Sequence, residues 1–231
     1  MSTTIRLLSY NVRSLRDDRQ AVARVIRATA PDVVCLQEMP RFFRWRKHAA
    51  RLARESGLVT VTGGAPSCGT MILSRLRVAV ERAEDLTFPL TRGAHRRGLA
   101  TAVLRLGRDT RLAVISCHLS LLAAERRAQG ELLLRRLAAM DVPAGVVAGD
   151  INEPAGGPTF RRLAGALTDG WERAPAGGEF TYPAGAGRRR IDAVLCTEAV
   201  TVRSCGVPTA PAADDLVRAS DHLPVLAELT V

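Results

Sequence analysis

Polar side chains stand where apolar, strand-like runs of the sequence begin or end. Glu38 follows the run Val-Val-Cys-Leu-Gln, and His118 follows Ala-Val-Ile-Ser-Cys. Asp150 follows Val-Val-Ala-Gly in the same way. The full set in chain order is Asn11, Glu38, His118, Asp150, Asn152, Asp192, Asp221 and His222. Carboxylates, amides and imidazoles without thiolates suit a hard divalent cation, so this set predicts a Mg²⁺ or Mn²⁺ site at one rim of a sheet.

The apolar pattern predicts a mixture of strands and helices that would position this set. In residues 17–30 apolar positions recur at helical spacing, Asp17 or Asp18 could cap the helix, and Pro31 would end it. Ser120 could cap a later helix. Helices are expected at 17–30, 44–56, 121–140 and 159–166, and strands at 4–12, 33–37, 58–62, 70–74, 77–86, 99–106, 111–118, 146–148, 191–196, 200–206 and 225–231. Because strand pairs adjoin in sequence, we expect two sheets with helices outside them.

The composition of the 231 residues is that of an ordinary globular chain, with 47% hydrophobic and 24% charged residues. No linker or repeat divides it, so we expect a single domain over residues 1–231. It contains no apolar run of about 18 residues, which a membrane span requires, and no secretory signal. Five cysteines without a Cys-X-X-Cys pair predict neither a zinc cluster nor a disulfide framework. We therefore expect a cytoplasmic monomer without a membrane anchor.

The charge balance is strongly basic, with 33 Lys+Arg against 23 Asp+Glu and a formal net charge of +10. Many of the arginines lie in segments next to the polar set. They are Arg13, Arg16, Arg41, Arg44, Arg46, Arg92, Arg96, Arg97, Arg188, Arg189, Arg190 and Arg218. Arginine binds phosphate in bidentate fashion, so this placement favours a substrate with several phosphates. The alternative is that these arginines offset the acidic cluster or lie on solvated loops.

Seven short motifs occur in an order that resembles the endonuclease/exonuclease/phosphatase superfamily. They are Leu-Ser-Tyr-Asn at 8–11, Leu-Gln-Glu at 36–38, Gly-Thr-Met-Ile-Leu-Ser-Arg at 69–75, Ser-Cys-His at 116–118, Gly-Asp-Ile-Asn at 149–152, Arg-Ile-Asp at 190–192 and Ser-Asp-His-Leu-Pro at 220–224. Each motif alone is weak, but together they extend over nearly the whole chain. The resemblance implies an α/β fold, a four-layer α/β/β/α sandwich with two mainly antiparallel sheets flanked by helices.

The resemblance also implies roles for the acids and amides. Glu38 would be the main metal ligand with Asn11 beside it, and Asp221 would help to hold the metal directly or through water. Asp150 would orient or deprotonate the attacking water. Asn152 would steady a phosphate oxygen. Water must lie in line with the leaving oxygen, and a cation with a charged histidine would stabilise the charge that develops.

The two histidines complete the implied site. His222 would contact the phosphate while Asp192 fixes its tautomer and favours the imidazolium. His118 would be a phosphate ligand or general acid. A histidine here favours the deoxyribonuclease-like and sphingomyelinase-like branch over exonuclease III-type repair enzymes, which carry tyrosine in that region. Arg97 and Arg190 are candidate substrate-phosphate ligands.

We therefore expect a divalent-metal-dependent phosphodiesterase or endonuclease acting on DNA. One alternative is a phosphatase or phosphodiesterase acting on inositol phosphates or phospholipid headgroups. Another is a phosphate-binding module that has lost catalysis. The absence of an amphipathic anchor from the sequence lowers the lipid alternative.

The three aromatic residues that follow Glu38 allow two interpretations. Phe42, Phe43 and Trp45 could form a substrate-facing shelf, but such a trio more often packs into a core. Aromatic residues are only 4% of the chain, which leaves few platforms for stacking on single strands. We therefore expect core packing at this trio and backbone-dominated recognition of the nucleic acid.

Overall fold

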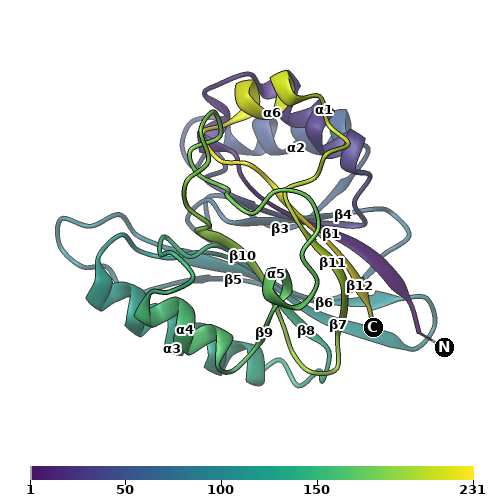
Figure 1. Cartoon of the computed structure of the whole chain (residues 1–231), viewed down its shortest axis with the longest axis vertical. Helices are drawn as coiled ribbons and strands as arrows, with labels where there is room; N and C mark the ends of the chain where they lie inside the picture. The colour runs from purple at the N-terminus through teal and green to yellow at the C-terminus, as the bar shows by residue number, and fades with distance from the viewer. Residues whose placement is uncertain (1) are drawn as a thin grey trace.

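The computed structural model describes residues 2–231 as two stacked sheets with helices on both outer faces (Figure 1). In chain order the elements are β1 (Thr4–Asn11), η1 (Arg13–Leu15), α1 (Arg19–Thr29), β2 (Val33–Gln37), α2 (Trp45–Ser56), β3 (Val59–Gly63), β4 (Met71–Ser74), β5 (Ala79–Thr87), β6 (Gly98–Leu106), β7 (Thr110–His118), α3 (Ala123–Ala138), β8 (Gly145–Asp150), α4 (Pro158–Ala164), β9 (Thr168–Asp169), α5 (Gly170–Arg173), β10 (Asp192–Cys196), β11 (Thr201–Gly206), α6 (Ala213–Ala219) and β12 (Val225–Thr230). Within residues 2–231 no helix is both long and apolar enough to cross a membrane.

Each sheet has six strands and is mainly antiparallel, as the sequence predicts. The first sheet has the order β11-β12-β1-β2-β4-β3, and the second has the order β5-β6-β7-β8-β10-β9. One central pair in each sheet is parallel, β1 with β2 and β7 with β8. The carboxyl ends of two strands therefore meet at one edge of each sheet.

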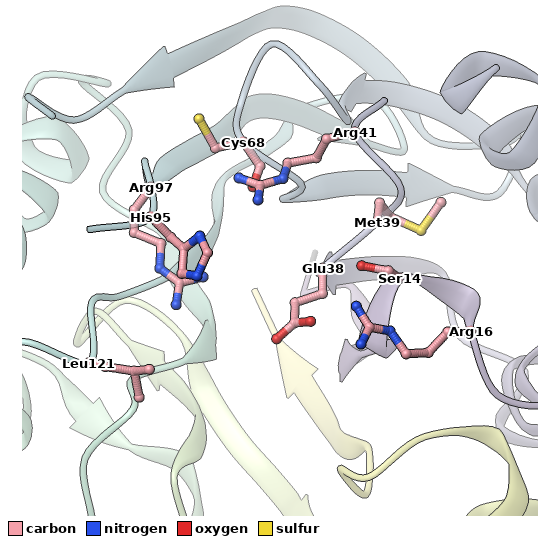
Figure 2. Close-up of a pocket in the computed structure, with 9 residues that line it drawn as sticks. All are labelled: Ser14, Arg16, Glu38, Met39, Arg41, Cys68, His95, Arg97 and Leu121. Atoms are coloured by element: carbon pink, nitrogen blue, oxygen red, sulfur yellow. The ribbon is translucent and has the colours of Figure 1, made fainter. Parts of the chain in front are cut away.

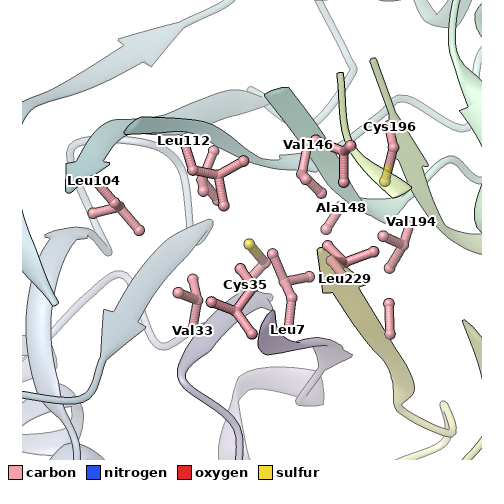
Figure 3. Packing of buried hydrophobic residues seen from close by; sticks show 14 of the residues in the cluster. Leu7, Val33, Cys35, Leu104, Leu112, Val146, Ala148, Val194, Cys196 and Leu229 are labelled. Carbon is pink, nitrogen blue, oxygen red and sulfur yellow. The ribbon is translucent and has the colours of Figure 1, made fainter. Parts of the chain in front are cut away.

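Three apolar layers hold the four-layer sandwich together. Between the sheets, Leu7 and Cys35 from one side meet Leu104 and Val146 from the other (Figure 3). A second cluster lies between the first sheet and α1, α2 and α6, and a third lies between the second sheet and α3 and α4. Central strands are consequently buried on both faces, which is why β2 and β8 are nearly continuous apolar runs in the sequence.

The helix boundaries test the local sequence signals. Asp18 caps α1 as predicted, because its carboxylate accepts hydrogen bonds from the backbone amides of Gln20 and Ala21. Ser120 is not the cap of α3, which begins after Leu122. The Ser120 hydroxyl instead accepts from the Leu122 amide and bonds the Glu125 carboxylate at 2.6 Å. The sequence does not predict η1, β9, α5 or α6. The first three have two to four residues, which carry no readable period, and in α6 only Ala219 is buried, so no apolar face marks the helix.

Candidate active site

Strand register brings three of the predicted residues into one row across the second sheet. His118 pairs with Asp150 in the parallel ladder of β7 and β8, and Asp192 pairs with Asp150 in the antiparallel ladder of β8 and β10. All three side chains are buried. Gly149 allows the close approach of β7, because a Cβ there would overlap the backbone oxygen of Cys117. The row is therefore fixed by backbone pairing.

The first sheet contributes Asn11 and Glu38 from the adjoining ends of β1 and β2. Asn11 pairs with Gln37 in the parallel ladder, and Glu38 is the next residue. The side-chain amide of Asn11 donates to Glu38 Oε1 at 3.2 Å and to Asp150 Oδ2 at 3.1 Å. Its oxygen accepts from the backbone amide of Arg13 at 3.1 Å. Asn11 thus joins the two sheets at this edge as a donor to both carboxylates.

His222 precedes β12 and lies against Asp192 in the buried row. His222 Nδ1 is 2.9 Å from Asp192 Oδ2, and His222 Nε2 is 3.8 Å from Asp150 Oδ2. Burial lowers the pKa of His222, but the charge and hydrogen bond of Asp192, assisted by Asp150 and Asp221, outweigh it and raise the pKa to about 9. The ring of Tyr182 packs on the imidazole, with centroids 4.8 Å apart. This setting favours the charged form of His222 near neutral pH, in which Nδ1–H donates to Asp192 and Nε2 also carries a proton.

His118 has the opposite electrostatic setting. Arg97 Nη1 lies 3.0 Å from His118 Nδ1, and His118 Nε2 lies 3.4 Å from Asp150 Oδ2. Because a guanidinium only donates, Nδ1 must accept, and the ring proton must be on Nε2, facing Asp150. Burial and the charge of Arg97 hold the pKa of His118 well below its usual value. A neutral His118 favours a hydrogen-bonding role over the general-acid role that the resemblance allows.

Asp150 is the centre of this network. Burial, followed by the nearby Asp192 carboxylate, raises its pKa to about 7, although the charge of His222 acts in the other direction. The backbone amide of Asn152 donates to Asp150 Oδ1 at 2.8 Å. The side-chain amide of Asn152 donates to the backbone oxygen of Leu119 at 2.8 Å. Asn152 therefore fixes both Asp150 and the loop that follows His118.

Glu38 extends into a pocket of about 300 Å³ at the edge of this network (Figure 2). Figure 2 shows Arg16 beside the Glu38 carboxylate and Arg97 across the pocket from it. The remaining lining residues are Ser14, Met39, Arg41, Cys68, His95 and Leu121. Arginines from three separate loops therefore face the same open space as the proposed metal ligand.

Two of the predicted site residues lie apart from the buried row. Asp221 is half-exposed, and its Oδ2 is 3.3 Å from Arg13 Nε. Arg190 is buried, and its guanidinium bonds Asp169 at 2.7 Å and Glu172 at 2.9 Å. The expected phosphate-binding role of Arg190 is therefore replaced by a structural one, because carboxylates already hold its guanidinium.

The expectation of core packing for the aromatic trio is wrong for two of its members. Phe42 and Phe43 are 81% and 80% exposed. Trp45 is half-buried and packs against the core between the first sheet and its helices. Sequence alone could not separate them, because the loop lacks the periodicity by which a buried face is recognised.

Comparison with known proteins places the whole arrangement in a family. The model of the Endonuclease/Exonuclease/phosphatase family matches residues 8–222. The chain belongs to this family. The matched residues run from the first predicted motif to His222, so the family's pattern includes every strand end that carries a site residue. A sequence comparison with curated proteins finds no match.

Solved structures share the fold over nearly the full length. An endonuclease/exonuclease/phosphatase from Bacteroides vulgatus is 18% identical, with 98% of each chain covered and a TM-score of 0.82. A mannosyl-6-phosphatase from Bacteroides thetaiotaomicron is 15% identical, with 97% of this chain and 99% of that chain covered and a TM-score of 0.78. Truncated TDP2 from Caenorhabditis elegans is 19% identical, with 99% and 98% covered and a TM-score of 0.77. At these identities the likeness concerns the fold.

The donor set fits the divalent cation on which enzymes of this family depend. Asp150 and Asp192 offer carboxylate oxygens that lie, with a ring nitrogen of His222, within 4.8 Å of one another. The charged His222 ring is a hydrogen-bond donor here, so the carboxylates are the ligand groups of this cluster. Within the described chain, the buried Asp192 Oδ1 has no hydrogen-bond partner. The Glu38 carboxylate adds oxygen donors from the pocket side. This edge therefore carries more negative oxygen than its own protein partners satisfy, which is the setting of a hard-cation site.

Sequence reasoning missed two residues at the site, Ser14 and Tyr182. Ser14 lines the pocket from the 3₁₀ turn η1, where it has a positive φ of 57°. Tyr182 reaches His222 from a loop with no regular element. No spacing or charge signal marks either of them.

Proposed function

We propose that this protein is a divalent-metal-dependent phosphodiesterase or endonuclease that hydrolyses DNA through in-line attack by an activated water. The observation that carries the proposal is the buried Asp150 carboxylate. It accepts from Asn11 and is approached by both His118 and His222, at the edge of the pocket that contains Glu38. Together these residues supply a proton acceptor in Asp150, a positive charge in His222, and oxygen ligands for a metal ion in Glu38.

Asp150 is the proposed acceptor of the proton from the attacking water. Burial raises its pKa to about 7, and a pKa near neutrality suits a general base that works at neutral pH. Asn152 holds Asp150 through its backbone amide and uses one side-chain N–H on Leu119. Since a carboxamide has two N–H donors, the second one remains for a phosphate oxygen.

The two histidines have different roles in this proposal. His222 uses Nδ1 on Asp192, so its Nε2 proton is the one directed at the phosphoryl oxygen. His118 stays neutral and holds Asp150 in place through Nε2. The presence of histidine at this position supports the deoxyribonuclease-like and sphingomyelinase-like branch.

Glu38 is the proposed main ligand of the metal ion, with Asn11 beside it and Asp221 close to Arg13 at the outer edge. When bound, Mg²⁺ or Mn²⁺ would supply charge stabilisation of the phosphoryl oxygens. The oxygen-rich donor set, without thiolates, supports these two metals over zinc.

The basic pocket supports DNA as the substrate. Arg16, Arg41 and Arg97 line it, and the chain carries a net charge of +10. A backbone with a phosphate at every nucleotide offers each of these arginines a partner. A metabolite with a single phosphate would engage fewer of them.

The proposal is tested with supercoiled plasmid and purified protein in Mg²⁺ or Mn²⁺. We expect nicking that stops in EDTA and in Asp150→Asn. If the plasmid stays intact while inositol phosphates or phospholipid headgroups release phosphate, the substrate is the alternative one. If no phosphoester is hydrolysed with either metal, the enzymatic proposal fails.

A further inference from the structure

The loop of residues 38–44, between β2 and α2, presents two aromatic rings to solvent at the edge of the candidate site. Phe42 and Phe43 are 81% and 80% exposed. Single exposed hydrophobic residues are normal on protein surfaces, so exposure alone indicates nothing. The surroundings of this pair distinguish it.

The guanidinium of a neighbouring arginine packs over each of these two rings. The Cζ atom of Arg41 lies 5.7 Å from the ring centroid of Phe42, and that of Arg44 lies 4.8 Å from the centroid of Phe43. Residues 39–54 contain no acid. The first acid after them, Glu55, is already paired with Arg51 at 2.7 Å. Glu38, at the start of the loop, is therefore its only acid, and the loop combines aromatic faces with the cations of Arg41 and Arg44.

The loop is joined directly to the pocket. It starts at Glu38, and Arg41 lines the same pocket as Glu38 (Figure 2). Arg41 Nη1 donates to the backbone oxygen of Arg96 at 3.2 Å. This anchor holds the base of the loop against the opposite wall. A strand whose phosphate is bound by Arg41 in this pocket would meet the loop that carries the rings.

We infer that Phe42 and Phe43 form a stacking platform for unpaired nucleotides of the DNA strand next to the bond that is cut. Bases stack on aromatic rings while cations hold the backbone, which is how single strands are bound without sequence preference. One face of each ring carries a guanidinium, and the other can receive a base. This inference rests on the proposed function and adds a preference for single-stranded or frayed DNA.

An anionic membrane surface is the rival occupant, because its headgroups also bind arginine and aromatic side chains. Position favours the nucleic acid, because Arg41 lines the pocket that contains Glu38 and is held there by the backbone oxygen of Arg96. A nucleotide offers a base face and a phosphate together. It therefore matches the ring and the cation at once.

The test is fluorescence anisotropy of a labelled oligothymidine and of a labelled duplex, measured in EDTA with the full chain. We expect Phe42→Ala/Phe43→Ala to weaken single-strand binding at least about fivefold, the loss typical of one stacked base. Duplex binding should change much less. Phe43→Trp should keep the affinity, because it keeps an aromatic face. Leu76→Ala is the matched control, since Leu76 is 85% exposed and follows Ser74, which pairs with Val33 at the far end of β2.

Three results would overturn the inference. They are unchanged single-strand affinity in the double variant, equal losses on single strand and duplex, and a loss confined to phosphatidylglycerol vesicles. Turnover of bis(4-nitrophenyl) phosphate by the wild type with Mn²⁺ tests the proposed function separately, because that diester has no bases. If the wild type hydrolyses this diester and the double variant keeps its affinity for single-stranded DNA, the stacking platform is rejected and the proposed function stands. No turnover of this diester together with no nicking of plasmid would reject the proposed function.

Discussion

The two sheets contribute unlike halves to the candidate site. The second sheet supplies a buried row, in which His118, Asp150 and Asp192 are 4%, 1% and 2% exposed. The first sheet adds the buried Asn11 and His222 beside this row, and it supplies Glu38 and Asp221, which are half-buried at the open edge. The row is built by backbone register, whereas Glu38 and Asp221 lie in loops just outside strands.

Because the two halves of the site differ in burial, we expect one to control proton transfer and the other to control the exchange of ligands. In the buried row, low solvent access strengthens each charge interaction, so one histidine is held neutral and the other cationic. At the open edge, carboxylates keep access to water and can exchange it for a metal ion or a phosphate. The buried half should therefore control the rate and its pH dependence, and the open half should control what binds.

The largest effect is expected from removing the charge at the centre of the buried row. Asp150→Asn should lower kcat by about 10²–10⁴-fold, the usual contribution of a general base. Plasmid nicking and single-turnover rates measure the loss. Asp109→Asn is the control, because Asp109 is exposed in the turn at the other end of β7. A kcat within twofold of wild type for Asp150→Asn would mean that the row is structural.

The next largest effect is expected on metal binding at the open edge of the site. Glu38→Gln should raise the Mn²⁺ concentration needed for half-maximal activity by about tenfold or more, since losing even a partner of a metal ligand costs that much. Metal titration of activity measures it, and calorimetric Mn²⁺ binding gives an independent readout. Glu198→Gln, in an exposed turn, should leave the titration unchanged. An unaltered metal requirement in Glu38→Gln would place the metal at Asp150 and Asp192 instead.

A third prediction concerns the pH dependence set by Asp192. The pKa of His222 is raised to about 9, so its charged form should support activity below that pH and be lost above it. Asp192→Asn removes the largest raising influence, so the alkaline limb of kcat/KM should move to lower pH. The loss should be small near pH 6 and larger near pH 8. An unshifted limb would show that His222 is not the group that titrates.

The same shift predicts how folding stability depends on pH. Because the folded pKa of His222 lies above its unfolded value of about 6.5, this stabilisation is fully present below pH 6.5 and is lost as pH rises through about 9. Urea unfolding between pH 6 and 9 should show the decline in the wild type. The decline should be smaller in Asp192→Asn.

The sequence predicts the buried half of the site better than its open half. Asp150 and Asp192 end or begin apolar runs, so strand pairing alone predicts that they meet. Arg190 also adjoins such a run, but its partner Asp169 lies in a two-residue strand with no readable pattern. Phe42 and Phe43 resemble core residues by type. The sequence can therefore predict which residues strand register brings together. It cannot predict where a loop side chain points, because tertiary contacts decide that.

The smallest effect on catalysis is expected at Arg190. Its ion pair with Asp169 is buried, with both side chains 5% exposed, and its guanidinium also packs over the ring of Phe160. Arg190→Gln should lower the free energy of unfolding by about 3–5 kcal/mol, because it leaves the Asp169 charge buried and unpaired. Measured where the variant is fully folded, KM for a small phosphodiester should stay at the wild-type value.

The exposed Arg188 provides the matched comparison for Arg190. Arg188→Gln should change stability little, since an exposed arginine loses no buried partner. If Arg190→Gln instead raised KM and left unfolding unchanged, its guanidinium would have to leave Asp169 for the substrate. The buried half would then take part in binding, and the division between a half that controls protons and a half that controls ligands would no longer hold. Urea unfolding and KM measured on the same two variants therefore decide between these arrangements.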